Sequence, residues 1–123
     1  MKKLLTFGII VAGLLLFLAS CQNKFIIEPL PEPGDTVSFS QNIAPIFTEQ
    51  GCIGCHYSTG QQPDLTPDNA YGKITGMGLV VEFDLVQSKI YYNPKPDGEH
   101  YAKYTLAQYQ LVNQWIMDGA LNN

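Results

Sequence analysis

The sequence contains no arginine, and its positive charge is small. All seven basic residues are lysines, and eleven acidic residues oppose them, which gives a net charge of −4. Proteins that bind nucleic acid through its phosphates need clustered lysine and arginine, so nucleic acid is not an expected partner. From Cys21 onward the chain is more acidic still, because five lysines remain against all eleven acidic residues.

Histidine and cysteine are also scarce, with two and three residues respectively. Two histidines do not make an acid–base constellation for catalysis, so we expect no enzymatic activity and no small-molecule substrate. Three cysteines are too few for the disulfide framework of a small secreted domain. The 123 residues contain no internal repeat and leave room for one small domain.

The first 20 residues have the pattern of an export signal. Lys2 and Lys3 precede an apolar stretch over residues 4–18, and Ala19 and Ser20 supply small residues where a signal peptidase cuts. A retained transmembrane helix is the alternative, because the apolar run is close to the shortest that spans a bilayer. The pattern favours a cleaved signal peptide over residues 1–20.

The segment Leu18-Ala19-Ser20-Cys21 resembles the bacterial lipobox. The resemblance implies that Cys21 is lipidated and becomes the first residue of a mature lipoprotein. Acyl chains hold such a protein at a membrane through their buried methylene groups. Residues 21–37, rich in proline, then form an expected tether to the domain. We therefore expect an exported protein that is anchored in a membrane and faces the periplasm or the cell surface.

Residues 38–123 form the expected domain, and its first helix precedes Gly51. Ser38 or Ser40 is the expected cap, and Pro45 implies a late start of the regular helix. One stripe of apolar side chains at helical spacing supports this helix: Phe39, Ile43, Ile46 and Phe47.

The last helix has the clearest pattern, with Thr105 as its N-cap and Gly119 near its end. Its apolar face is formed by Leu106, Tyr109, Val112, Ile116 and Ala120. Shorter helices are expected over residues 66–74 and 84–91, and residues 79–83 are a short, weak candidate for a strand. The predicted fold class is all-α.

The motif Cys52-Ile53-Gly54-Cys55-His56 is typical of covalent haem attachment. On a helical turn both thiols face the same way and can add to two vinyl groups on one edge of a porphyrin. His56 then lies under the ring and ligates the iron. The sequence thus predicts one covalent haem c. A zinc site, a redox-active dithiol and a plain disulfide between Cys52 and Cys55 are the alternatives.

Here the chain resembles the class I c-type cytochromes, the small single-haem domains of bacterial lipoproteins and electron-transfer complexes. The resemblance covers residues 38–123 and rests on the attachment motif, on the helix before it, on Gln62-Pro63-Asp64-Leu65-Thr66 and on residues 111–120. It implies a fold in which the first and last helices cross. It also implies that the Pro63 carbonyl accepts the second ring N–H of His56 and raises its basicity. The alternative is that Pro63 is an ordinary turn proline.

In this family a methionine from the loop before the last helix usually completes the iron coordination. That loop, residues 94–104, contains His100 and no methionine, so His100 is the predicted distal ligand. Met77, between Gly76 and Gly78, is the alternative, whereas Met117 is expected to be packed or exposed.

Three aromatic residues are considered as partners of a haem propionate. Trp115 is expected to pack in the core on Phe47, and the alternative is an indole N–H bound to a haem propionate. Tyr101 and Tyr104 lie near the expected distal loop, from which they can reach a propionate.

These features predict an electron-transfer protein, either free-standing or part of a larger respiratory complex, whose partners are other redox proteins. One alternative is a haem enzyme or gas-binding sensor with an open sixth iron position. The other is a haem-free interaction lipoprotein in which the cysteines are paired.

Overall fold

The computed structural model describes residues 35–123, so the expected signal peptide, Cys21 and most of the tether lie outside the described residues. The described part is 42% helical and contains no strand, which confirms the all-α prediction for it. Its helical elements are η1 (Phe39–Ile43), α2 (Ala44–Glu49), η2 (Cys52–Gly54), α3 (Ala70–Gly76), α4 (Lys89–Tyr92) and α5 (Leu106–Met117). None of these helices is long and apolar enough to cross a membrane.

The first helical segment joins a π-helical turn, η1, to the α-helix α2. The Ser38 hydroxyl accepts a hydrogen bond from the Gln41 N–H, so Ser38 is the N-cap. Pro45 lies in the first turn of α2, where its missing N–H removes no intrahelical hydrogen bond. After α2, Gly51 adopts the left-handed conformation, with a φ of 70°, and the chain turns into η2.

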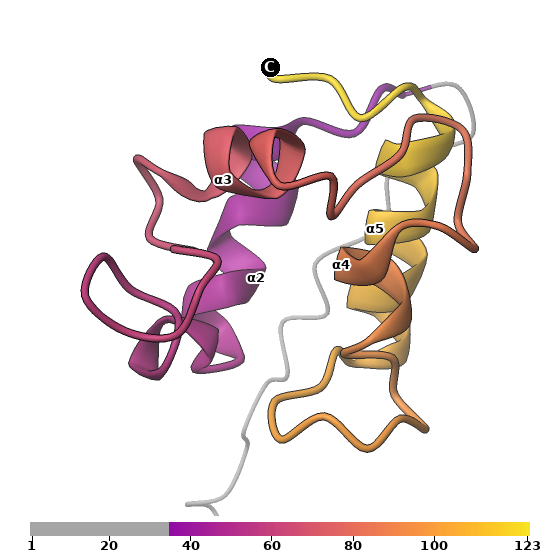
Figure 1. The fold of residues 1–123 in the computed structure, drawn as a ribbon. Coiled ribbons are helices and arrows are strands. Elements are labelled where there is room, and N and C mark those ends of the chain that lie inside the picture. The colour runs from indigo at the N-terminus through magenta and orange to yellow at the C-terminus, as the bar shows by residue number, and fades with distance from the viewer. Residues whose placement is uncertain (1–34) are drawn as a thin grey trace, which may run out of the picture.

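The longest helix, α5, begins at a capping box that Thr105 forms with Gln108. It contacts both η1 and α4, and Figure 1 shows α4 lying against it. The last residue, Asn123, returns to the start of the domain: its backbone oxygen accepts hydrogen bonds from the Ser40 N–H at 3.0 Å and the Ser38 hydroxyl at 2.8 Å. The two ends of the domain are thereby joined.

Two helices begin later than the sequence predicted. α3 starts at Ala70 rather than beside Thr66, because the Asp64 carboxylate accepts hydrogen bonds from the Thr66 N–H and hydroxyl and holds a turn there. α4 is likewise confined to Lys89–Tyr92, because the Asp84 side chain accepts hydrogen bonds from backbone N–H groups of the preceding turn. Residues 79–83 form no strand and contribute one isolated bridge, Val81 to Asp84.

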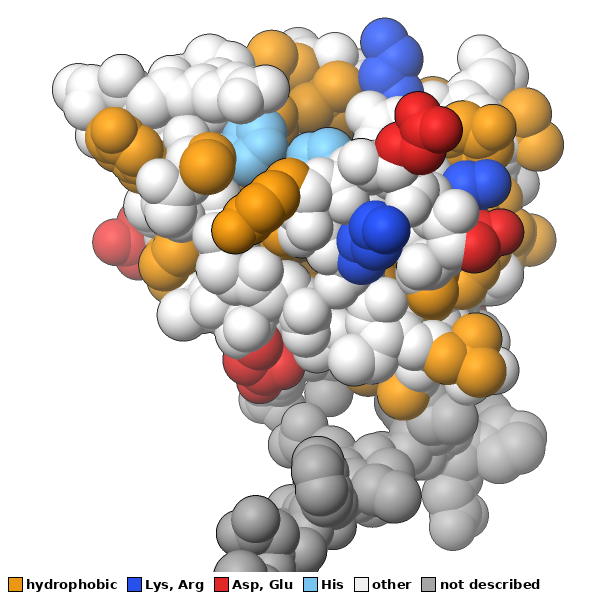
Figure 2. All heavy atoms as spheres, turned by 90° about the horizontal axis from the view of Figure 1, so that it is seen from below, with side chains coloured by type: hydrophobic (Ala, Val, Ile, Leu, Met, Phe, Trp, Pro, Cys, Tyr) orange, Lys and Arg blue, Asp and Glu red, His pale blue; other side chains and the backbone are white. Residues whose placement is uncertain are grey.

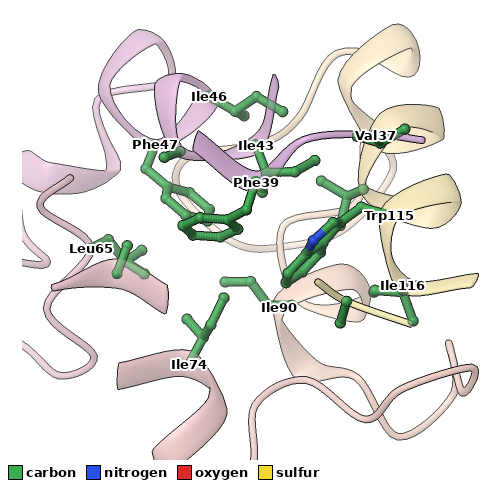
Figure 3. Close-up of a cluster of buried hydrophobic side chains, with 14 of the residues drawn as sticks. Val37, Phe39, Ile43, Ile46, Phe47, Leu65, Ile74, Ile90, Trp115 and Ile116 are labelled. Carbon is green, nitrogen blue, oxygen red and sulfur yellow. The ribbon is translucent and has the colours of Figure 1, made fainter. Parts of the chain in front are cut away.

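Trp115 lies at the centre of the core (Figure 3). Its side chain is fully buried, and its indole N–H donates to the Leu121 carbonyl at 2.9 Å. Its aromatic neighbours are Phe39, with ring centroids 5.3 Å apart, and Tyr71 at 6.4 Å, rather than the Phe47 that the sequence suggested. The core role of Trp115 is therefore confirmed, and its indole N–H already has a partner.

Candidate functional site

A cavity of about 260 Å³ lies among four segments: the turn after α2, the end of α3, helix α4 and the loop before α5. Its wall is largely apolar, with Phe47, Leu65, Leu79 and Ile90 among the lining side chains. Both histidines of the chain also line it, and Figure 2 shows them side by side at the surface, bordered by hydrophobic side chains. An apolar hollow with a few converging polar groups is the usual form of a cofactor site.

The attachment motif contributes Cys52 to this wall. Its side chain is 6% exposed, and burial raises the pKa of its thiol, as does the nearby Cys55. Cys55 is exposed and lies outside the cavity wall, so only Cys52 of the two lines the cavity, whereas the sequence predicted that both thiols face the same way. The turn between them is closed by hydrogen bonds from the N–H groups of Cys55 and His56 to the Cys52 carbonyl, at 3.1 and 2.8 Å. Both thiols are free in the structure.

His56 is held by the loop that follows it. Its Nδ1 lies 3.1 Å from the Gln61 carbonyl oxygen and 3.2 Å from that of Pro63. Because carbonyls only accept hydrogen bonds, the neutral ring carries its hydrogen on Nδ1, which leaves Nε2 with a lone pair for a metal. The Pro63 contact is the one that the family resemblance implies.

His100 is oriented in the same manner by a backbone carbonyl of its own loop. Its Nδ1 lies 2.8 Å from the Ala102 carbonyl oxygen, so Nε2 again carries the free lone pair in the neutral ring. The loop that carries His100 is closed at its base, where the Tyr104 N–H donates to the Pro94 carbonyl at 2.8 Å. The buried Tyr104 hydroxyl donates to the Ile90 carbonyl at 2.9 Å, and burial raises the pKa of this tyrosine.

The two imidazole rings form a pair. Their centroids are 6.2 Å apart, and their planes are inclined by 22°. An imidazole nitrogen binds a first-row metal ion at about 2 Å and lies roughly 1 Å from its own ring centre, so two rings on opposite sides of one ion have centroids about 6 Å apart. The centroid separation of His56 and His100 is thus short enough for both rings to bind one metal ion.

The other residues that the sequence singled out divide into two groups. Met77 also lines the cavity, at the C-cap of α3, and is 49% exposed. Tyr101, which is 98% exposed, and Met117, at 45%, lie outside the cavity wall. The sequence reasoning missed Lys89 and Asn93, which line the cavity from α4 and its C-cap. Their spacing of four residues was the one signal that placed them on a common side.

The side chains available as metal ligands favour a metal ion that is already bound by a cofactor. Within residues 35–123, no three histidine, cysteine, aspartate or glutamate side chains come together to hold a metal ion. The histidine pair would supply two ligands to a haem iron, and the porphyrin would bring the others. The residues present therefore fit a haem better than a bare zinc ion, which needs four protein ligands. No protein-family model, curated protein or solved structure matches the chain.

Proposed function

We propose that this chain is an electron-transfer protein that carries one covalently bound haem c in the cavity. In this proposal Cys52 and Cys55 form the thioether bonds, and His56 and His100 are the axial ligands. One observation carries it: two imidazoles 6.2 Å apart, each with Nδ1 on a backbone carbonyl, line one apolar cavity beside a Cys-x-x-Cys-His motif.

The bound haem supplies an iron that alternates between the ferrous and ferric states. The residues of the chain determine how that iron behaves. The Gln61 and Pro63 carbonyls fix the orientation of His56 and raise its basicity, and the Ala102 carbonyl does the same for His100. Two basic imidazoles favour ferric iron, so the midpoint potential is expected to lie below that of a histidine–methionine site.

His100 also distinguishes an electron-transfer protein from a gas-binding sensor or haem enzyme, in which one position of the iron stays open. His100, held at its Nδ1 by the Ala102 carbonyl, would ligate the iron and keep exogenous ligands out. The side chains of Phe47, Leu65 and Leu79 form an apolar part of the wall beside the histidines.

We extend the proposal to the fold of the domain, to Cys21 and to the partners of the protein. The all-α domain is compatible with the class I cytochrome c fold, which we propose for residues 38–123. We propose further that Cys21 is lipidated and that redox proteins dock on the domain, either freely or within a respiratory complex. The acidic mature chain favours partners with a basic docking face.

The test is a redox titration of the exported, purified protein, followed by exposure of the reduced form to carbon monoxide. We expect a Soret band, a reversible one-electron transition and no rapid carbon monoxide binding. Fast, stoichiometric binding would assign the chain to the sensor or enzyme class instead. A colourless protein with paired cysteines would leave only the haem-free interaction lipoprotein.

A further inference from the structure

Lys89 is the one residue in the cavity wall with a full charge at neutral pH, and no carboxylate accompanies it there. Asn93, four residues later, adds an amide to the same wall. The backbone N–H of Asn93 donates to the Lys89 carbonyl, so the two side chains lie one helical turn apart on the same side of α4. Both residues are exposed, which places them at the mouth of the cavity.

Both side chains have hydrogen-bond donors to spare. Among the described residues, no carboxylate lies within ion-pairing distance of Lys89, and the Asn93 amide has no protein partner. The nearby Lys95 differs, because its ammonium group lies 3.7 Å from the Asp97 carboxylate and 5.0 Å from the centre of the Tyr92 ring. Lys89 is therefore the cation available to a ligand in the cavity.

The backbone of α4 is fixed by its neighbours. The Ser88 hydroxyl donates to the Asp84 carbonyl at 2.6 Å and accepts from the Val81 N–H at 2.9 Å. The Ile90 N–H donates to the Leu79 carbonyl at 2.9 Å. The two donors at the mouth are thus presented by a rigid turn of helix rather than by a free loop.

The aromatic donors that the sequence suggested for a haem propionate are committed elsewhere. The Trp115 indole N–H donates to Leu121, and the Tyr104 hydroxyl donates to Ile90. Tyr101 is 98% exposed and lies outside the cavity wall. None of the three has a free donor in the cavity.

We infer that Lys89 and Asn93 bind the propionate carboxylates of the haem, an inference that rests on the proposed function. A carboxylate at the edge of an apolar cavity needs a cation or strong donors in place of the water that it loses. Figure 1 places α4 on a different side of the molecule from the segment after α2, which carries the cysteines. Covalent attachment at the cysteines leaves the opposite, carboxylate-bearing edge of the porphyrin for such partners.

The positive charge of Lys89 also stabilises the added electron of the ferrous state, because Lys89 lies in the cavity wall and the attraction between opposite charges grows as their distance falls. Lys89→Gln should therefore lower the midpoint potential of the haem, and Lys89→Arg should restore it. Resonance Raman spectroscopy should show a shifted propionate bending mode in Lys89→Gln, which a purely structural role would leave in place. Asn93→Leu should change that mode as well, with a smaller shift in potential, since it removes a neutral donor.

Lys73→Gln is the matched control, because it removes the same charge from an exposed residue that lies outside the cavity wall. Solvent and salt screen a charge in that position, so its variant should keep both the potential and the propionate mode of the wild type. A Lys89→Gln protein with covalent haem, an unshifted mode and the potential of the Lys73→Gln control would overturn the inference. Loss of the haem from the wild type would instead overturn the proposed function, and its absorption spectrum reports this separately.

Discussion

His56 and His100 reach one cavity from positions 44 residues apart, and each is oriented by a backbone carbonyl on Nδ1. Side-chain partners are replaced easily by mutation, whereas a carbonyl depends only on the path of the chain. The orientation of both rings is therefore a property of their loops. The sequence predicted both residues, His56 from the attachment motif and His100 from a loop without methionine, but their separation of 6.2 Å required the structure.

The distal ligand can be tested at this scale with His100→Ala and Met77→Leu. We expect wild-type ferric protein and Met77→Leu to share a low-spin spectrum without a red thioether-to-iron charge-transfer band. His100→Ala should lose the bis-histidine spectrum and gain carbon monoxide binding in its reduced form. A charge-transfer band in the wild type that disappears in Met77→Leu would assign the sixth position to Met77, which lines the same cavity.

The loop between His56 and Leu65 is tightly packed at Gly60. A Cβ on Gly60 would lie 2.5 Å from the Cys55 carbonyl oxygen and 2.6 Å from a Tyr57 ring carbon. The Cys55 carbonyl also accepts the Gln61 N–H, so any shift there moves a carbonyl that orients His56. The glycine allows the loop to fold tightly back on the attachment motif.

Gly60→Ala should therefore destabilise the domain by about 1–3 kcal/mol, the usual cost of overpacking. It should also disturb the ferric haem spectrum, because the Gln61 carbonyl moves with the loop. Gly54→Ala is the matched control, since a Cβ there meets nothing within 4 Å. Urea unfolding and absorption spectra measure both effects, and equal behaviour of the two variants would contradict this account of the loop.

Asp64, directly after Pro63, gives the same loop a dependence on pH. Hydrogen bonds from the Thr66 hydroxyl and N–H, and then from the Asn69 amide, hold the pKa of Asp64 below its ordinary value. A lowered pKa in the folded state contributes stability above the unfolded value of about 3.9, and this contribution is lost as the pH falls through the folded value. Asp64 thus stabilises the loop at neutral pH and less so in acid.

Asp64→Asn should lower the urea midpoint at pH 7, and the difference from wild type should shrink at pH 3. The asparagine carries no charge at either pH, and its own amide hydrogens oppose those of Asn69. Asp68→Asn, an exposed carboxylate in the same segment, should leave the midpoint unchanged. A difference between Asp64→Asn and wild type that stays constant from pH 7 to pH 3 would refute the linkage.

The helices show what local sequence predicts and what it misses. The N-cap and first residues of α5 follow directly from Thr105 and the apolar face behind it. The starts of α3 and α4 were placed too early, because the Asp64 and Asp84 carboxylates accept hydrogen bonds from backbone N–H groups and hold the backbone in turns. Lys89 and Asn93 were missed for a related reason: the loop containing Met77 and the loop containing His100 define the cavity mouth only after folding.

At the scale of the whole molecule, the ends of the domain meet and the cavity opens away from the core. Asn123 accepts hydrogen bonds from Ser38 and Ser40, more than 80 residues earlier in the chain, and such long-range pairing leaves no local pattern. Trp115 belongs to the same core cluster as five side chains that line the cavity: Phe47, Cys52, Leu65, Ile90 and Tyr104. This arrangement leaves the histidine pair supported by packing but reachable from solvent.

We propose above that one haem is bound covalently through Cys52 and Cys55. The most direct measurement is the mass of the exported, purified protein under denaturing conditions, before and after extraction with acid acetone. We expect the mass of the mature, lipidated chain plus one haem in both samples, with the colour remaining on the protein. A Cys52→Ser/Cys55→Ser double variant should yield the mass of the chain alone. If the wild type also yields only the mass of the chain, or if acid acetone removes its colour, the claim is contradicted.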